Sequence, residues 1–257
     1  MTPFAQALSE HIAQARGLKL WSLIVTILGD LTPEPQDQMP GPVLQALVEA
    51  LGLQPQAMRV ALHRLKRDGW VDSTRAGRIS HFRLSEMGRA QTDAVRARVF
   101  AGAPQPLATC ALVVLPPEVK DVADEAGVLW VGRQALITLD GDAMRSEGGV
   151  VANLAPEALP DWVQELVNEA ACSTGMATLA AQLAHAQVAP ADPFDQCLER
   201  IVILHAWRRL ALRATPLAES LAGPLSASAR CRAEVAKALA QRPKLDLKRL
   251  QDAISDV

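Results

Sequence analysis

The chain has 257 residues, a formal net charge of −2 and an apolar content of 49%. This length is enough for two or three domains, and the near-neutral charge does not by itself indicate a polyanionic partner. The four cysteines and five histidines are scattered, without a Cys-x-x-Cys pair. We therefore expect no metal site, no disulfide framework and no cofactor, but buried thiols in a reducing cytoplasm.

The first hundred residues are predicted to be helical, with one hairpin. The apolar run Leu20–Leu28 is too short to span a bilayer, and no signal-peptide cleavage site follows it. We therefore expect a buried helix here and no membrane partner. A proline-rich loop is predicted over Thr32–Pro42. Further helices are expected over Phe4–Ala15, Val43–Leu51 and Glu86–Phe100.

Another helix is predicted to begin near Pro55 and to end at Gly69, a residue that is free to adopt a positive φ. Apolar residues recur along it at helical spacing and form one stripe, which we expect to face the core. The stripe consists of Met58, Ala61, Leu62 and Leu65. Together with the helix before Gly52, this helix has the form of a helix-turn-helix.

The opposite side of this helix is polar and basic. We predict that Gln56, Arg59 and His63 face base edges in the major groove, because the first turns of a recognition helix lie deepest there. Arg64 and Arg67 flank them and are predicted to contact phosphates. The alternative is that these residues are only the solvated face of an amphipathic helix, with His63 a neutral surface residue.

A short basic hairpin follows this helix. Two extended segments are expected on either side of a turn that contains Gly77. Arg75 and Arg78 flank this glycine, so both are predicted to reach phosphates or an adjacent minor groove. Ser85 is expected to cap the next helix. Helix and hairpin together predict a winged helix-turn-helix that binds double-stranded operator DNA. The alternatives are a solvated turn and a winged helix that binds another protein.

The charge is distributed unevenly along the chain. From Gln54 to Arg98, ten Arg and Lys residues face four Asp and Glu residues, a net charge of +6. From Ala101 onward, 14 basic residues face 19 acidic ones, a net charge of −5. A basic module joined to an acidic remainder indicates one part that faces DNA and another part with a different task.

The sequence predicts an α+β protein with domains at 1–100, 107–187 and 194–257. Short strands and helices in the middle domain predict a small α+β sandwich of ferredoxin-like type. Its strands are expected over Ala108–Leu115, Val128–Val131, Ala135–Leu139 and Val150–Leu154, and its helices over Val119–Ala126, Pro160–Cys172 and Met176–Ala186. The last domain is predicted to be helical, over Phe194–Arg213, Ser226–Gln241 and from Leu245, with a turn after Arg213.

Catalytic motifs are absent from the sequence: it contains no G-x-S-x-G, no P-loop and no G-x-G-x-x-G. The run Asp140-Gly141-Asp142 is similar to a pair of metal-binding carboxylates. Asp and Gly both favour turns, however, so we expect a turn here and no enzyme activity. A metal-dependent nuclease is the less favoured alternative.

Four segments resemble one family of bacterial regulators. The runs Ser22–Asp30, Met58–Trp70, Gly77–Arg89 and Ile203–Arg213 are similar to the phenylacetic acid degradation repressor (PaaX) family. The resemblance implies a dimeric transcriptional regulator, usually a repressor of a catabolic operon. It also implies a winged helix, a central ferredoxin-like (Cas2-like) domain and a helical C-terminal domain. A homodimer is also expected because one winged helix reads only one half-site.

The resemblance further implies release from the operator by an aryl-CoA thioester, phenylacetyl-CoA in the founding cases. Two departures leave the effector open. The family's central strand opens with an aromatic residue, whereas Leu107–Leu115 contains none. The loop after the C-terminal Arg-Arg helix also lacks the family's Asp and Trp.

One C-terminal segment gathers an imidazole, an indole and two guanidiniums. Guanidiniums bind phosphate bidentately and an indole offers a flat face to a ring, so this cluster is predicted to bind the CoA thioester. The cluster consists of His205, Trp207, Arg208 and Arg209. Trp130 and Arg133 in the central domain are a second candidate for the same pocket. The alternative is that the arginines form ion pairs and Trp207 belongs to the core.

Overall fold

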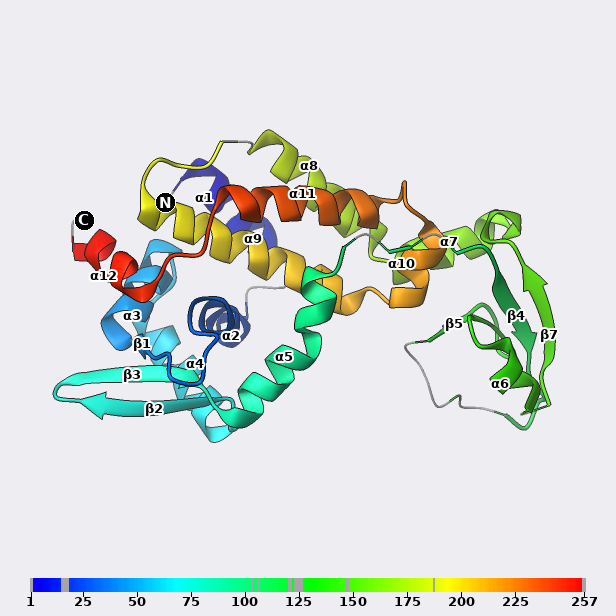
Figure 1. Cartoon of the computed structure of the whole chain (residues 1–257), viewed down its shortest axis with the longest axis horizontal. Coiled ribbons are helices and arrows are strands. Elements are labelled where there is room, and N and C mark those ends of the chain that lie inside the picture. The colour runs from blue at the N-terminus through cyan, green and yellow to red at the C-terminus, as the bar shows by residue number, and fades with distance from the viewer. Residues whose placement is uncertain are drawn as a thin grey trace. The chain divides into compact units, whose positions relative to one another are not determined.

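The computed structural model describes residues 2–14, 19–102, 104–105, 107–119, 122, 127–146, 148–186 and 188–255. Figure 1 shows a mixed arrangement of helices and two separate sheets, which confirms the α+β class. The chain divides into two compact units. Unit 1 consists of residues 1–100, 182–208 and 235–257, and unit 2 of residues 101–181 and 209–234. Three helices have residues in both units: α8 (Ser173–His185), α9 (Pro193–Arg213) and α11 (Ala227–Gln241). The three-domain division remains a prediction.

Unit 1 contains helices and a three-stranded antiparallel sheet in the order β1-β3-β2. The strands are β1 (Met39–Pro40), β2 (Val71–Ala76) and β3 (Ile79–Leu84). The helices that belong wholly to this unit are α1 (Pro3–Gln14), α2 (Leu20–Leu31), α3 (Gly41–Ala50), α4 (Pro55–Arg67), α5 (Glu86–Phe100) and α12 (Leu247–Ser255). All the helices predicted over residues 1–100 are present; α5 has the predicted bounds, and the others begin or end a few residues away from theirs.

Helix α2 forms the centre of unit 1. Every residue from Leu23 to Leu28 is buried, and the helix contacts both α4 and β3. A helix that is apolar around its whole circumference belongs in a protein core. This confirms the prediction of a buried helix at the apolar run. Within the described residues, none of the helices combines the length and the apolar character that crossing a membrane requires.

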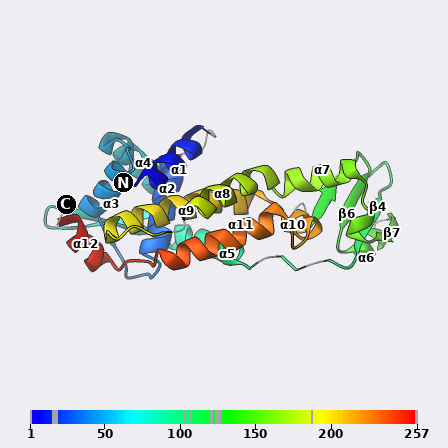
Figure 2. The same cartoon turned by 90° about the horizontal axis from the view of Figure 1, so that it is seen from above.

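Unit 2 is built on a four-stranded antiparallel sheet in the order β5-β6-β4-β7. The strands are β4 (Cys110–Val114), β5 (Val128–Trp130), β6 (Ala135–Thr138) and β7 (Val150–Leu154). The other elements are α6 (Gly141–Ser146), the 3-10 turn η1 (Pro156–Ala158), α7 (Asp161–Ala170) and α10 (Pro216–Ala222). Figure 2 shows α6 beside β4 and β7, which it contacts.

Both faces of this sheet are covered. Side chains alternate along a strand, so neighbouring residues enter different cores. Cys110, Leu129 and Ile137 pack with residues of α7 and α10 on one face. Ala111 and Leu136 pack with Met144 of α6 and other residues on the other face.

Besides η1, three short elements were not predicted. Met39 is fully buried and pairs with Phe82 of β3, so a strand lies inside the predicted loop. Asp140 accepts a hydrogen bond from the Ala143 amide at 3.0 Å and begins α6, where we expected only a turn. Thr215 accepts from the Ala218 amide and begins α10, again in place of a turn. Most of the helix predicted over Val119–Ala126 lies outside the described residues.

The cysteines are mostly buried, as predicted. Cys110, Cys197 and Cys231 are buried, whereas Cys172 is only partly so. Burial raises the pKa of the Cys197 thiol and of the Cys231 thiol to about 12. Both thiols therefore stay protonated at neutral pH, which keeps them unreactive.

Candidate nucleic-acid interface

Helix α4 is held against the core by the predicted apolar stripe. Its buried residues are Met58, Ala61, Leu62 and Leu65, which confirms the stripe. The helix contacts α2, α3 and β2. Gly69 has φ +76 and ends the helix, with the Trp70 amide donating to the Leu65 carbonyl at 2.8 Å. This is a Schellman motif, in which a left-handed residue satisfies the last carbonyls of the helix.

The opposite face of α4 is exposed along its length. Gln56, Arg59 and His63 all lie on it. The Arg59 Nη1 donates to the Gln56 Oε1 at 3.5 Å, so these two side chains meet one turn apart. Val60, next to them, is an apolar residue that is 62% exposed. This face presents hydrogen-bonding groups and one exposed apolar side chain, which are the kinds of group that can contact base edges.

The C-terminal end of α4 carries a small ion-pair cluster around Asp68. Arg67 donates to this carboxylate at 2.9 Å, and Arg64 at 3.4 Å. The hydrogen bond from Arg67 lowers the pKa of Asp68 most strongly. Both arginine side chains remain more than half exposed. Exposed pairs of this kind contribute little to stability, so both guanidiniums are available to other anions.

The hairpin places two arginines at its tip. Gly77 has φ +62, which the turn between β2 and β3 requires. Arg75 and Arg78 flank it and are exposed, and Arg75 Nε donates to the Gly77 carbonyl at 3.2 Å. The hairpin is fastened to α4 by a hydrogen bond of 2.7 Å from Lys66 Nζ to Ser73 Oγ. This bond joins the exposed surface of α4 to the hairpin.

A tight contact joins α5 to the end of α4. Ser85 Oγ donates to the Gly69 carbonyl and accepts from the Gly88 amide, which confirms Ser85 as a cap. A Cβ atom at Gly88 would lie 2.2 Å from the Trp70 carbonyl oxygen. Only glycine allows this approach. The sequence shows Gly88, but the partner that explains it becomes visible only in the fold.

Two of the predicted effector residues lie in the core of unit 1. Trp207 is 2% exposed, and its indole N–H donates to the Val99 carbonyl at 2.7 Å. His205 is also buried, with its Nδ1 at 3.1 Å from the Thr26 hydroxyl. A ligand could reach neither ring without a rearrangement of the core.

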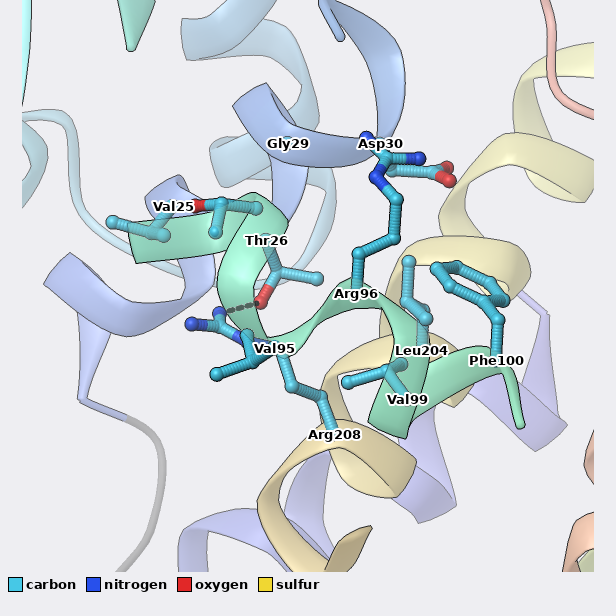
Figure 3. A pocket seen from close by; sticks show the side chains of 11 residues that line it. Val25, Thr26, Gly29, Asp30, Val95, Arg96, Val99, Phe100, Leu204 and Arg208 are labelled. Atoms are coloured by element: carbon cyan, nitrogen blue, oxygen red, sulfur yellow. Dashed lines mark hydrogen bonds between the residues drawn. The ribbon is translucent and has the colours of Figure 1, made fainter. Parts of the chain in front are cut away.

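The two neighbouring arginines of α9 belong to different units. Arg208 lies in unit 1 and lines a cavity between α2, α5 and α9 (Figure 3). Arg209 lies in unit 2, one helical turn before Arg213. Desolvation and then the Arg213 charge lower the pKa of Arg209. Arg209 and Arg213 therefore form a pair of neighbouring cations.

Trp130 and Arg133 are also separated from the first group. Trp130 lines a cavity of about 330 Å³ in unit 2, together with Arg213 and Thr215 among other residues. Arg133 is exposed and is not among the residues that line this cavity. The structure thus brings Trp130 together with an arginine that the sequence did not single out. Among the described residues, no group of three or more His, Cys, Asp and Glu side chains could hold a metal ion.

A family match lies in the N-terminal part of the chain. Residues 19–88 match the model of a family described as "PaaX-like protein". The transcriptional repressor PaaX of Escherichia coli (strain K12) is 31% identical over 131 residues. That match covers 49% of this chain and 41% of the relative, so the chain spans about two fifths of the relative's length.

One solved structure is also similar. It is the uncharacterized protein Rv0674 from Mycobacterium tuberculosis, with 14% sequence identity and a TM-score of 0.43. The similarity covers 90% of this chain and 97% of that chain. At this TM-score the likeness does not establish a common fold.

Proposed function

We propose that this protein is a DNA-binding transcriptional repressor and not an enzyme. The proposal is supported by the match of residues 19–88 to the PaaX-like family and by the similarity to a PaaX repressor. The observation that carries the proposal is the exposed basic face of α4 beside a hairpin with arginines at its tip. These elements make up a winged helix-turn-helix, with α4 as the recognition helix and β2–β3 as the wing. The protein acts in the cytoplasm, where operator DNA is found.

The contacts with DNA divide into two kinds. Gln56, Arg59 and His63 read base edges, because they lie on the outer face of the first turns of α4. Arg64, Arg67 and the two arginines of the wing bind phosphates, which position the helix without selecting a sequence. Selection of bound duplexes from a random pool tests this division, and failure to enrich any sequence would contradict it.

The wing makes a contribution that does not depend on sequence. Replacing Arg75 and Arg78 together by alanine is expected to weaken binding to all duplexes about equally. It should lower the slope of log K against log salt by roughly two units, because two phosphate contacts are lost. Fluorescence anisotropy at several salt concentrations measures the slope. Arg145→Ala, an exposed change in unit 2, is the control. An unchanged slope in the double variant would show that the wing points away from DNA.

The repressor is proposed to act as a homodimer. One recognition helix covers one half-site, and specific operators of this class place two half-sites a helical turn or more apart. Sedimentation at micromolar concentration should therefore show twice the mass of the 27.5 kDa chain, at least in the presence of a palindromic site. A species of 27.5 kDa alone under both conditions would reject the dimer.

The central sheet supports a ferredoxin-like architecture for the middle of the chain. Its order β7-β4-β6-β5 places the first strand between the third and the fourth, and all neighbours are antiparallel. Met144 of α6 and Val122 of the connection after β4 lie in the same core cluster. Both residues therefore pack in the core on the same face of the sheet, the face covered by α6.

A CoA thioester is the proposed effector, and the structure favours the cavity of unit 2 as its site. Trp130 and Arg213 line this cavity, so an indole is available to a ring and a guanidinium to a phosphate. Arg209 does not line the cavity, but it precedes Arg213 by one turn and adds a second cation near it for a diphosphate. Phenylacetyl-CoA is expected to weaken operator binding, because it favours the state that does not bind DNA. The variant Arg209→Ala/Arg213→Ala should keep operator affinity and lose this release. Calorimetry without heat for any of a panel of CoA thioesters would contradict the proposal.

A further inference from the structure

The cavity between α2, α5 and α9 lies entirely within unit 1, and its mainly apolar lining includes an arginine. Its volume is about 40 Å³. Most of the lining is apolar, and includes Val25, Val95, Val99 and Leu204. Arg208 brings a guanidinium into this apolar space. Figure 3 shows its side chain extending from α9 to Thr26 of α2, with Val95 beside it.

The charge of Arg208 has no counter-charge among the described residues. Its Nη1 donates to the Thr26 hydroxyl at 3.1 Å, and no described carboxylate pairs with it. Asp30 also lines the cavity, but both of its oxygens accept hydrogen bonds from Arg200, at 2.7 and 2.8 Å. Burial lowers the pKa of Arg208, which reflects the cost of removing this cation from water. A bound anion would offset that cost.

The mouth of the cavity adds positive charge. A second, larger and open cavity shares Asp30, Arg96 and Phe100 with the first, and is also lined by Lys244. Among the described residues, Arg96 pairs only with the exposed Asp93, at 3.3 Å. Because Arg200 compensates Asp30 and Asp93 compensates Arg96, Lys244 leaves the lining of this entrance with a net positive charge that attracts an anion.

From this lining we propose that the cavity binds a small monocarboxylate, with the carboxylate on Arg208 and the alkyl group among the valines. A volume of about 40 Å³ corresponds to roughly three water molecules, which sets the ligand at about two to four carbon atoms. Guanidinium and carboxylate match each other in planar, bidentate geometry. A CoA thioester has no such carboxylate and is too large for this space. The inference therefore goes beyond the proposed effector and does not depend on DNA binding.

A ligand in this cavity would contact the two helices that adjoin the proposed DNA-binding elements, α2 and α5. The cavity separates α2, which packs on α4, from α5, which begins at the end of the hairpin. At Gly29 the same two helices are already close, since a Cβ atom there would lie 3.2 Å from the Thr92 methyl group. A bound acid would thus be in contact with both helices.

The test is calorimetric titration of the full chain with sodium acetate and sodium butyrate, at constant ionic strength set with sodium chloride. Acetamide is the neutral control of almost the same shape. We expect saturable binding of the acids at roughly millimolar concentration and none of acetamide. Equal binding of acetamide, or no saturable heat with either acid, would overturn the proposal.

Two variants locate the binding. Arg208→Met removes the cation, keeps the apolar stem and should lower acetate affinity by roughly tenfold or more. Val95→Phe keeps the cation but fills the space, and should also abolish binding. Arg145→Met on the exposed α6 is the matched control and should bind acetate as the unchanged chain does. Circular dichroism establishes that each variant is folded. Acetate affinity unchanged in Arg208→Met would place the ligand elsewhere and refute the site.

Discussion

Replacing Glu199 by alanine is expected to lower the free energy of unfolding of unit 1 by about 3–5 kcal/mol. Glu199 accepts from Arg242 Nε at 2.6 Å, and the two residues are 3% and 0% exposed. Loss of the carboxylate leaves the Arg242 guanidinium buried against the carbonyls of Ala238 and Ala186 and the Phe4 ring, with no counter-charge among the described residues. A buried charge without a counter-charge is among the most destabilising changes in a core.

Urea denaturation followed by circular dichroism measures this effect. Glu49→Ala, an exposed change on α3 of the same unit, is the matched control and should stay within about 0.5 kcal/mol. Replacing Glu199 by Leu together with Arg242 by Met should recover most of the loss, because it removes both charges. If Glu199→Ala resembled the Glu49 control, residues 182–208 and 235–257 would not be fastened to each other through this pair.

Arg59→Ala is expected to cost roughly 1–3 kcal/mol of operator affinity and to relax the sequence preference at one base pair. Arg59 lies on the exposed face of the first turns of α4, next to Gln56. A guanidinium there can bind the two acceptors of a guanine bidentately, which no other base offers. The loss should therefore be large on the operator and small on random DNA.

Anisotropy titrations with the selected operator and with a random duplex measure the two losses. Arg145→Ala provides the control for removal of an exposed arginine far from α4 in the sequence. Equal losses on both duplexes would assign Arg59 to the phosphate backbone. Base readout would then rest on Gln56, His63 and the exposed Val60, whose methyl groups could contact a thymine.

Local sequence rules predicted the elements that carry the proposed interface. The stripe of α4 follows from helical spacing, and the end of this helix follows from Gly69. The cap at Ser85 also depends on neighbours in the sequence. In contrast, β1 is two residues long and exists only because Met39 pairs with Phe82, far along the chain. No local pattern predicts such a strand.

The candidate ligand residues show the same limit. His205, Trp207, Arg208 and Arg209 are close in the sequence. They lie on one helix, however, so their side chains point in different directions and enter different surroundings. The Trp207 indole is in the core because its partner is the Val99 carbonyl, 108 residues away. Hydrogen bonds between residues so far apart in the sequence depend on how the helices pack, and neither composition nor residue spacing predicts them. For the same reason, the sequence did not show that Arg208 lines a cavity.

The central claim, that unit 1 binds DNA through α4 and the hairpin, is tested most directly by the salt dependence of binding. The affinity of the full chain for its selected duplex is measured between about 50 and 300 mM KCl. We predict a linear fall of log K with log salt, with a slope of about −4 for each protomer, since Arg64, Arg67, Arg75 and Arg78 would each release a counterion. A slope near zero, or no duplex bound at 50 mM salt, would contradict DNA binding and indicate a protein partner instead.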